Sequence, residues 1–260
     1  MTLDALTERA ERAESELFHR LISTAPDAVR SRLGIATARF SGRVVTSVRD
    51  DATNYWSNAL GFGLDEPVTA ALVEPSPTSS SQKRTPGPLI QIAPALLPAD
   101  WAEICDRHAL RSGGARYQHI CSGDDFRQTA STDLHVGRAT NAVEWTRFTM
   151  RGFGMPEEDS SDMLGPGCDS DEVQLFAAWD GDYMVAAASS FVWQDVTVLN
   201  SGVTLPSHRN RGAQSALIAS RAAAAADAGC RWLVTQTAKP DPGTQNPSTN
   251  NRSSGPGPAL

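Results

Sequence analysis

The chain has 260 residues, of which 40% are hydrophobic and 20% charged, and its formal net charge is −7. Its length and its six Trp, eight Phe and three Tyr allow two modest cores and exclude a chain that is disordered throughout. No run approaches the eighteen apolar residues of a membrane helix, and no basic stretch indicates nucleic acid. We therefore expect neither a membrane nor a nucleic acid as partner.

The cysteines and the N-terminus indicate the compartment. Cys105, Cys121, Cys168 and Cys230 are far apart, with neither the spacing of a zinc knuckle nor the density of a disulfide scaffold. We expect reduced thiols and no metal. The first residues are acidic and amphipathic rather than basic and then apolar, so they do not resemble a secretory signal. We expect a cytoplasmic protein.

The charge is unevenly distributed along the chain. From residue 206 to the end there are six Lys or Arg and two Asp, a local charge of +4, which leaves −11 on residues 1–205. A basic last fifth in an acidic protein indicates that an anion is held there.

The first part of the chain alternates between helix and strand patterns. Residues 3–21 carry apolar side chains at intervals near 3.6, which indicates an amphipathic helix, and 35–40 and 43–48 predict two strands or a hairpin around Ser41-Gly42. Residues 58–73 predict a turn and then a helix. Residues 89–93 predict a buried strand, and 98–110 a helix. This alternation favours the α/β class.

Two segments are unsuited to a core. Residues 75–88 contain no aliphatic or aromatic side chain, and sixteen of the last twenty-one residues are Pro, Gly, Ser, Thr or Asn. Residues 111–131 are polar and weakly patterned, so we place a domain boundary near residue 130. We expect a motif-poor N-terminal α/β region at 1–130 and a second domain at 131–260.

The pattern is clearer beyond this boundary. Residues 134–139 alternate as a half-buried strand, 143–150 have helical spacing, and 173–179 and 183–191 predict two strands around Asp180-Gly181. A further strand at 196–205 precedes a breaker-free, alanine-rich helix at 213–227, and 230–237 follow as a buried strand. This order predicts a βαβ unit with parallel strands.

The loop before the helix at 213 is the best candidate for a binding site. Backbone N–H groups converge at a helix N-terminus, Arg209 and Arg211 add positive charge, and Gly212 permits close approach of a ligand. Loop composition alone leaves two interpretations, a phosphate site or a surface turn with solvated arginines. His208 is either a phosphate contact or a solvated turn residue, and we favour the second.

The order of elements over 132–237 resembles the Gcn5-related N-acetyltransferase (GNAT) family. Residues 209–214 match the family signature Gln/Arg-x-x-Gly-x-Gly/Ala at its first and fourth positions, while Gln214 stands where Gly or Ala is usual. Residues 205–209 are similar to the family's strand end, and 215–217 and 228–230 to its helix and helix exit.

The resemblance implies a GNAT-like acyl-CoA-binding fold, a mixed sheet that opens between its fourth and fifth strands with acetyl-CoA as co-substrate. Backbone groups of 203–205 would pair with the pantetheine arm, and 209–215 would hold the pyrophosphate, mainly through main-chain N–H groups. The implied cofactor-binding residues are Val203, Thr204, Leu205, Arg209, Asn210, Arg211, Gly212, Ala213, Gln214 and Ser215. Because tandem copies occur in this family, residues 1–130 are a candidate for a degenerate second copy.

The implied chemistry is direct attack of a substrate amine on the acetyl thioester. The catalytic residues stay unknown. Glu144 and Glu172 are candidates for the base, with surface carboxylates as the alternative, and no tyrosine follows Tyr183 to act as the acid. Residues 246–251 are similar to the opening of the family's next helix, but the following residues are not. We expect an altered or truncated C-terminal end, and we hypothesise a shifted reading frame there and at 75–88.

The resemblance thus implies an N-acetyltransferase, acting on acyl groups other than amino-acyl groups, that transfers the acetyl group of acetyl-CoA to a primary amine. The alternative is a non-catalytic acyl-CoA-binding or structural module. The expected partners are a small-molecule or peptide amine and a second copy of the chain in a homodimer.

Overall fold

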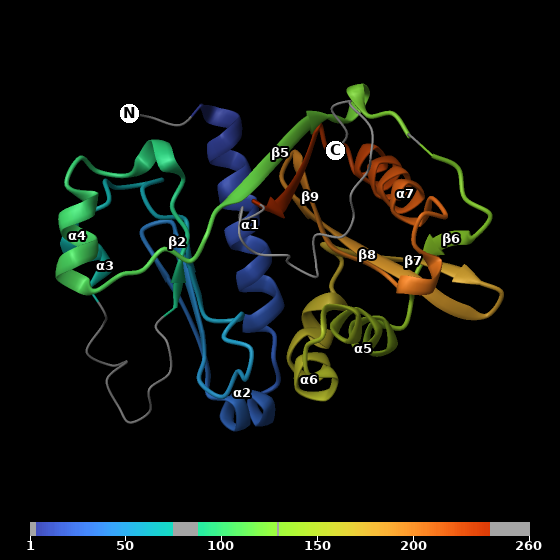
Figure 1. Ribbon diagram of the computed structural model, residues 1–260, viewed down its shortest axis with the longest axis horizontal. Helices are drawn as coiled ribbons and strands as arrows, with labels where there is room; N and C mark the ends of the chain where they lie inside the picture. The colour runs from blue at the N-terminus through green and yellow to red at the C-terminus, as the bar shows by residue number, and fades with distance from the viewer. Residues whose placement is uncertain (1–3, 75–87, 129, 240–260) are drawn as a thin grey trace. The chain divides into compact units, whose positions relative to one another are not determined.

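The computed structural model describes residues 4–74, 88–128 and 130–239. The predictions for 75–87 and for the chain after 239, including the shifted frame, lie outside the described residues. Contacts divide the chain into two compact units, Met1–Gly113 and Gly114–Leu260 (Figure 1). This division precedes the boundary that the sequence indicates near residue 130, because 116–122 form a strand in the sheet of the second unit.

The first unit contains a four-stranded sheet in the order β1-β2-β3-β4. Its strands are β1 (Ile35–Phe40), β2 (Arg43–Val48), β3 (Asn58–Leu60) and β4 (Leu89–Ile90), and its helices are α1 (Ala5–Ser23), α2 (Asp27–Leu33), α3 (Ala70–Val73) and α4 (Trp101–His108). The amphipathic α1 and the hairpin of β1 and β2 are confirmed, and α1 packs on both strands. The buried strand predicted at 89–93 is wrong in length and burial, because β4 has two residues and Leu89 is exposed.

The second unit contains a six-stranded sheet in the order β5-β10-β9-β8-β7-β6. Its strands are β5 (Arg116–Ser122), β6 (His135–Arg138), β7 (Val173–Asp180), β8 (Tyr183–Trp193), β9 (Val196–Thr204) and β10 (Trp232–Ala238). Its helices are α5 (Ala142–Phe153), α6 (Glu157–Cys168) and α7 (Ala213–Asp227). The pairs β6–β7, β7–β8 and β8–β9 are antiparallel, and β9 and β10 are parallel on either side of the crossover helix α7, as predicted.

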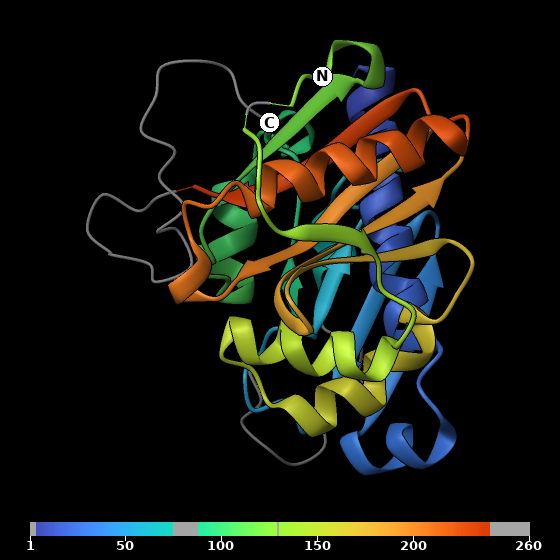
Figure 2. The same ribbon diagram turned by 90° about the vertical axis from the view of Figure 1, so that its right-hand side faces the viewer.

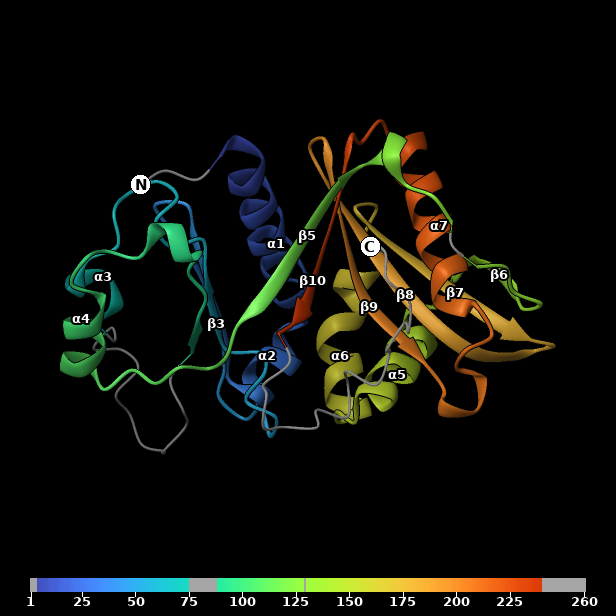
Figure 3. The same cartoon turned by 45° about the horizontal axis from the view of Figure 1, so that its top comes forward.

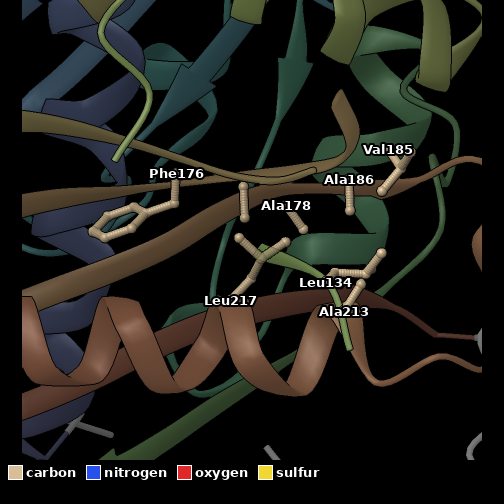
Figure 4. Close-up of a cluster of buried hydrophobic side chains, with 8 residues drawn as sticks. Leu134, Phe176, Ala178, Val185, Ala186, Ala213 and Leu217 are labelled. Atoms are coloured by element: carbon tan, nitrogen blue, oxygen red, sulfur yellow. The ribbon is translucent and has the colours of Figure 1, made fainter. Parts of the chain in front are cut away.

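Helices cover both faces of this sheet. In Figures 2 and 3, α7 lies along one face, and α5 and α6 lie on the other. Leu217 and Ala213 of α7 pack against Phe176 on β7 and Ala186 on β8 (Figure 4). On the opposite face, the buried Trp145 of α5 donates its indole N–H to the carbonyl of Phe176, at 2.9 Å. The buried Ala213 therefore anchors the first turn of α7 on the sheet.

Two elements of this unit are not predicted from the sequence. The polar, weakly patterned segment near 120 forms β5, which pairs antiparallel with β10 from Ser122↔Trp232 to Arg116↔Ala238. The other is α6, whose Gly165 and Pro166 are poor helix formers but whose Met163 and Leu164 are buried.

Within residues 4–74, 88–128 and 130–239, no helix has both the length and the apolar character that crossing a membrane requires.

Candidate functional site

The strands β9 and β10 separate after a short parallel contact. Their pairing runs from Val196↔Trp232 to Val198↔Val234. The Thr235 hydroxyl then donates to the carbonyl of Leu199 at 2.9 Å. Beyond this point β10 pairs with β5, and β9 with β8. In the series β6 to β10 these are the fourth and fifth strands, so the predicted opening of the sheet between them is confirmed.

A bulge interrupts β9 next to this opening. The register with β8 shifts between Val203↔Ala187 and Asn200↔Ser189, and Ser201 has a φ of 53°. A bulge adds a residue and re-aims the side chains that follow. It therefore decides which of Gly202 to Thr204 face α7 and which face α5.

The bulge is held by Arg221 of α7. This side chain is buried, and its Nη1 donates to the carbonyls of Ser189 and Asn200 at 3.1 and 3.3 Å. Burial away from water lowers the pKa of the Arg221 guanidinium to about 9. A buried cation needs hydrogen-bond acceptors around it, and the two strand carbonyls at the bulge supply them.

The connection from β9 to α7 has the shape expected of an anion-binding loop. A 3₁₀ turn at Pro206–His208 follows the strand, Asn210 has a φ of 63°, and Gly212 has a φ of 76° and precedes the helix. Within the described part of the chain, no side chain caps this helix end. The N-terminus of α7 therefore keeps its positive partial charge facing outward from the helix.

Gly212 is required here for steric reasons as well. A Cβ atom at this position would lie 2.1 Å from the carbonyl oxygen of Ser131, and the positive φ is itself unfavourable for other residues. The segment that leads into β6 therefore lies directly against the loop.

Arg211 is the residue that anchors the loop. Its guanidinium donates to the carboxylates of Asp133 and Asp180, at 2.5 and 2.6 Å, and Asp180 is also 3.3 Å from Nε2 of His208. The hydrogen bonds from Arg211 lower the pKa of both aspartates and raise that of the arginine. Its charge is thus already matched by two carboxylates.

Arg209 differs from Arg211 in this respect. Its side chain is exposed, and in the part of the chain that the structure describes it takes part in no ion pair. Of the two arginines that the sequence places in the loop, Arg209 is therefore the one whose charge is available to an anion.

The strand residues before the loop are fixed from both faces of the sheet. Val203 is buried beside α5, where a Cβ at Gly152 would lie 2.2 Å from Val203 Cγ2, so only glycine permits this packing. The side chain of Gln214, in the first turn of α7, donates to the carbonyl of Val203 at 3.0 Å and to the hydroxyl of Thr204 at 2.8 Å. Leu205 packs on the cluster drawn in Figure 4, and its N–H donates to Val185.

The two glutamates considered as bases lie elsewhere. Glu144 is in the first turn of α5, where its backbone N–H is capped by Asn141 and its carboxylate accepts from the same amide group at 3.4 Å. Glu172 precedes β7, at the end of that strand opposite Asp180. Among the described residues, no group of three or more His, Cys, Asp or Glu side chains could hold a metal ion. No sequence pattern indicates Arg221, because its contacts are carbonyls from two different strands.

Comparisons with solved structures bear on the fold. A GCN5-related N-acetyltransferase from Kribbella flavida has a TM-score of 0.52 and 14% sequence identity, with 90% of this chain and 87% of that chain covered. AAC(6')-Iy in complex with the bisubstrate analogue CoA-S-monomethyl-acetylneamine has a TM-score of 0.36 and 18% identity, covering 43% of this chain and 82% of that one.

A functionally unknown conserved protein from Staphylococcus epidermidis ATCC 12228 has a TM-score of 0.40 and 14% identity, with 59% of this chain covered; the match spans 60% of that protein's length. No protein-family model and no curated protein matches the sequence. The architecture is similar to that of the GCN5-related N-acetyltransferase from Kribbella flavida, and the resemblance predicted from residues 132–237 is thereby confirmed at the level of the fold.

Proposed function

We propose that the chain is an acetyl-CoA-dependent N-acetyltransferase that acts on a primary amine of a small molecule or peptide. The observation that carries the proposal is the separation of β9 from β10 beside a loop that ends at the N-terminus of α7. An extended ligand with amide groups can hydrogen-bond to a free strand edge, and a diphosphate is favoured at a helix N-terminus. Coenzyme A carries both groups in one molecule.

The ten predicted cofactor-binding residues lie at the end of β9, in the loop or in the first turn of α7. In the proposal, backbone groups of 203–205 pair with the pantetheine arm, and main-chain N–H groups between Arg209 and Ser215 face the diphosphate. The exposed Arg209 adds a positive charge, and Arg211 holds the loop in shape through its two aspartates. Arg211 is thus a positioning residue in this scheme.

The proposed reaction is a single displacement at the thioester. The amine nitrogen attacks the acetyl carbonyl carbon, the C–N bond forms and the C–S bond breaks. The proton of the amine passes to a base or water, and the leaving thiolate takes up a proton to give free CoA. A strand N–H at the opening would stabilise the oxyanion that develops on the carbonyl oxygen.

A second candidate is an acyl-CoA-binding module without turnover. It is favoured by the positions of Glu144, which takes part in capping α5, and of Glu172, at the far end of β7. Release of free thiol from acetyl-CoA with a panel of primary amines separates the two candidates. An enzyme releases thiol with at least one amine, whereas a module binds acetyl-CoA and releases none.

Binding itself is tested by thermal shift with acetyl-CoA. We expect the wild-type protein to be stabilised and Arg209→Glu to lose most of this shift, because the charge reversal places a carboxylate beside the diphosphate. Arg111→Glu makes the same charge change at an exposed position of the first unit and should keep the wild-type shift. No shift for the wild type, or equal shifts for all three proteins, would contradict the proposed site.

A further inference from the structure

The side chain of Gln214 lies along the end of β9. Its Nε2 donates to the Val203 carbonyl at 3.0 Å and to the Thr204 hydroxyl at 2.8 Å. Its Oε1 is 3.1 Å from the position that a Cβ at residue 202 would take. The primary amide of Gln214 therefore covers the strand from Gly202 to Thr204.

This position coincides with the residues proposed to bind the pantetheine arm. The arm carries amide groups, and the side chain of Gln214 ends in an amide as well. Val203 is buried and lies in the ladder with β8, opposite Ala187, while Thr204 is half-buried. In the free protein Gln214 adds a hydrogen bond to the Val203 carbonyl and supplies one to the Thr204 hydroxyl. A ligand amide at the same place would have to displace those hydrogen bonds and the side chain that makes them.

The loop does not depend on Gln214 for its shape. Arg211 bridges Asp133 and Asp180, Ala216 donates to the carbonyl of Gly212, and Ala213 is buried in the core cluster of α7. Gln214 is half-buried, and both hydrogen bonds of its side chain go to β9 and none to the loop. Its truncation should leave the fold of the loop unchanged.

We propose that Gln214 is an internal competitor of the pantetheine arm, so that CoA binds only when this side chain leaves the end of β9. The proposal rests on the proposed function. Residue 214 then sets the affinity for CoA, and a smaller residue there gives tighter binding. Net loss of one or two hydrogen bonds corresponds to about a tenfold change in affinity.

The test is calorimetric titration of the whole chain with two probes. CoA carries the arm and the diphosphate, whereas ADP carries a diphosphate without the arm. We expect Gln214→Ala to bind CoA about tenfold more tightly than the wild type and to bind ADP with wild-type affinity. Gln214→Leu removes the same hydrogen bonds but keeps the bulk, so it should gain less affinity for CoA than Gln214→Ala. Gln128→Ala, which removes an exposed glutamine that donates to the Ala130 carbonyl, is the matched control and should match the wild type.

The outcomes separate this inference from the proposed function. Unchanged or weaker CoA binding by Gln214→Ala, with binding by the wild type, overturns the inference and leaves the proposed function in place. An equal gain for CoA and ADP also overturns it, because the side chain would then obstruct the diphosphate and not the arm. CoA binding by neither protein overturns the proposed function and the inference together. A thermal melt without ligand shows that each variant is folded.

Discussion

Gly212 combines a backbone constraint with a steric one, and the two can be separated by experiment. Any side chain there must adopt a φ of 76° and place its Cβ 2.1 Å from the Ser131 carbonyl oxygen. Gly154, at the end of α5, has a similar φ of 72° with nothing within 4 Å of its Cβ position. Alanine substitutions at these two glycines therefore differ only in the close contact with Ser131, and comparing them isolates its cost.

We predict that Gly154→Ala lowers the free energy of unfolding by about 1 kcal/mol, the ordinary cost of a left-handed residue. Gly212→Ala should lose a further ~1–3 kcal/mol, because the chain around Ser131 has to move. Urea denaturation of the two variants measures both values. Equal losses of unfolding free energy would mean that the segment before β6 can move away from residue 212 at no cost in stability.

The sequence indicates a loop directly before α7, but not the contacts that its residues make. Gly212 is identifiable because a helix pattern starts directly after it. The pairing of Arg211 with Asp133 and Asp180 is not, because these aspartates lie on other elements and resemble ordinary surface charges. The same holds for Gln214, which the sequence marks only as a departure from a motif.

The Arg211 ion pairs connect three parts of the unit: the segment just before β6, the end of β7, and the loop before α7. Both carboxyl groups have a folded-state pKa lowered from 3.8, chiefly by the hydrogen bonds from Arg211. Their contribution to stability is therefore present above the unfolded pKa of about 3.9 and is lost as the pH falls through the lowered values.

We predict that Arg211→Gln lowers the melting temperature at pH 7 and that its difference from the wild type shrinks as the pH falls below the unfolded pKa of about 3.9. High salt should also reduce the difference, since all three groups are near solvent. Arg49→Gln removes a pair with the neighbouring Asp50 that joins no separate elements, and should change the melting temperature less. Thermal melts from pH 7 downward test this; a difference that does not vary with pH would show that Arg211 acts through packing alone.

Elements with strong local signals are predicted well and those stabilised by distant contacts are not. The helix α7 has the predicted bounds because its alanine-rich run lies between Gly212 and Gly229 without a breaker. The helix α6 is missed because Gly165 and Pro166 weaken its local preference, while packing on α5 stabilises it. The degenerate second GNAT copy in the first unit stays a prediction, since its four-stranded sheet with β3 and β4 parallel has no feature that decides it.

For the whole molecule, β5 lies between the two possible domain boundaries, at residue 113 and near residue 130, so fragments cut at either place differ in whether they contain it. A fragment of residues 114–260 contains β5 and keeps every strand of the six-stranded sheet, whereas one of 131–260 loses β5 and leaves β10 with one edge unpaired. An unpaired strand that carries Leu233 and Val234 is a site for association between chains.

We predict that the fragment 114–260 is monodisperse and folded, and that the fragment 131–260 aggregates. Size-exclusion chromatography and circular dichroism on the two fragments measure this. If both behave alike, the pairing of β5 with β10 contributes little to the integrity of the sheet, and the boundary near residue 130 is as good as the one at 113.

The pairing of β5 with β10 also determines the order in which the second unit can form. Ser122 faces Trp232, which follows it by 110 positions, and β6 to β9 with their helices lie between them. Contacts at such a sequence separation form late, because the entropy of closing the intervening chain is lost before they are gained. During synthesis β5 leaves the ribosome before the other strands of its sheet, and it has no strand to pair with until β10 has been made. The edge strand β5 is therefore the first strand of its sheet to be translated and among the last to be paired.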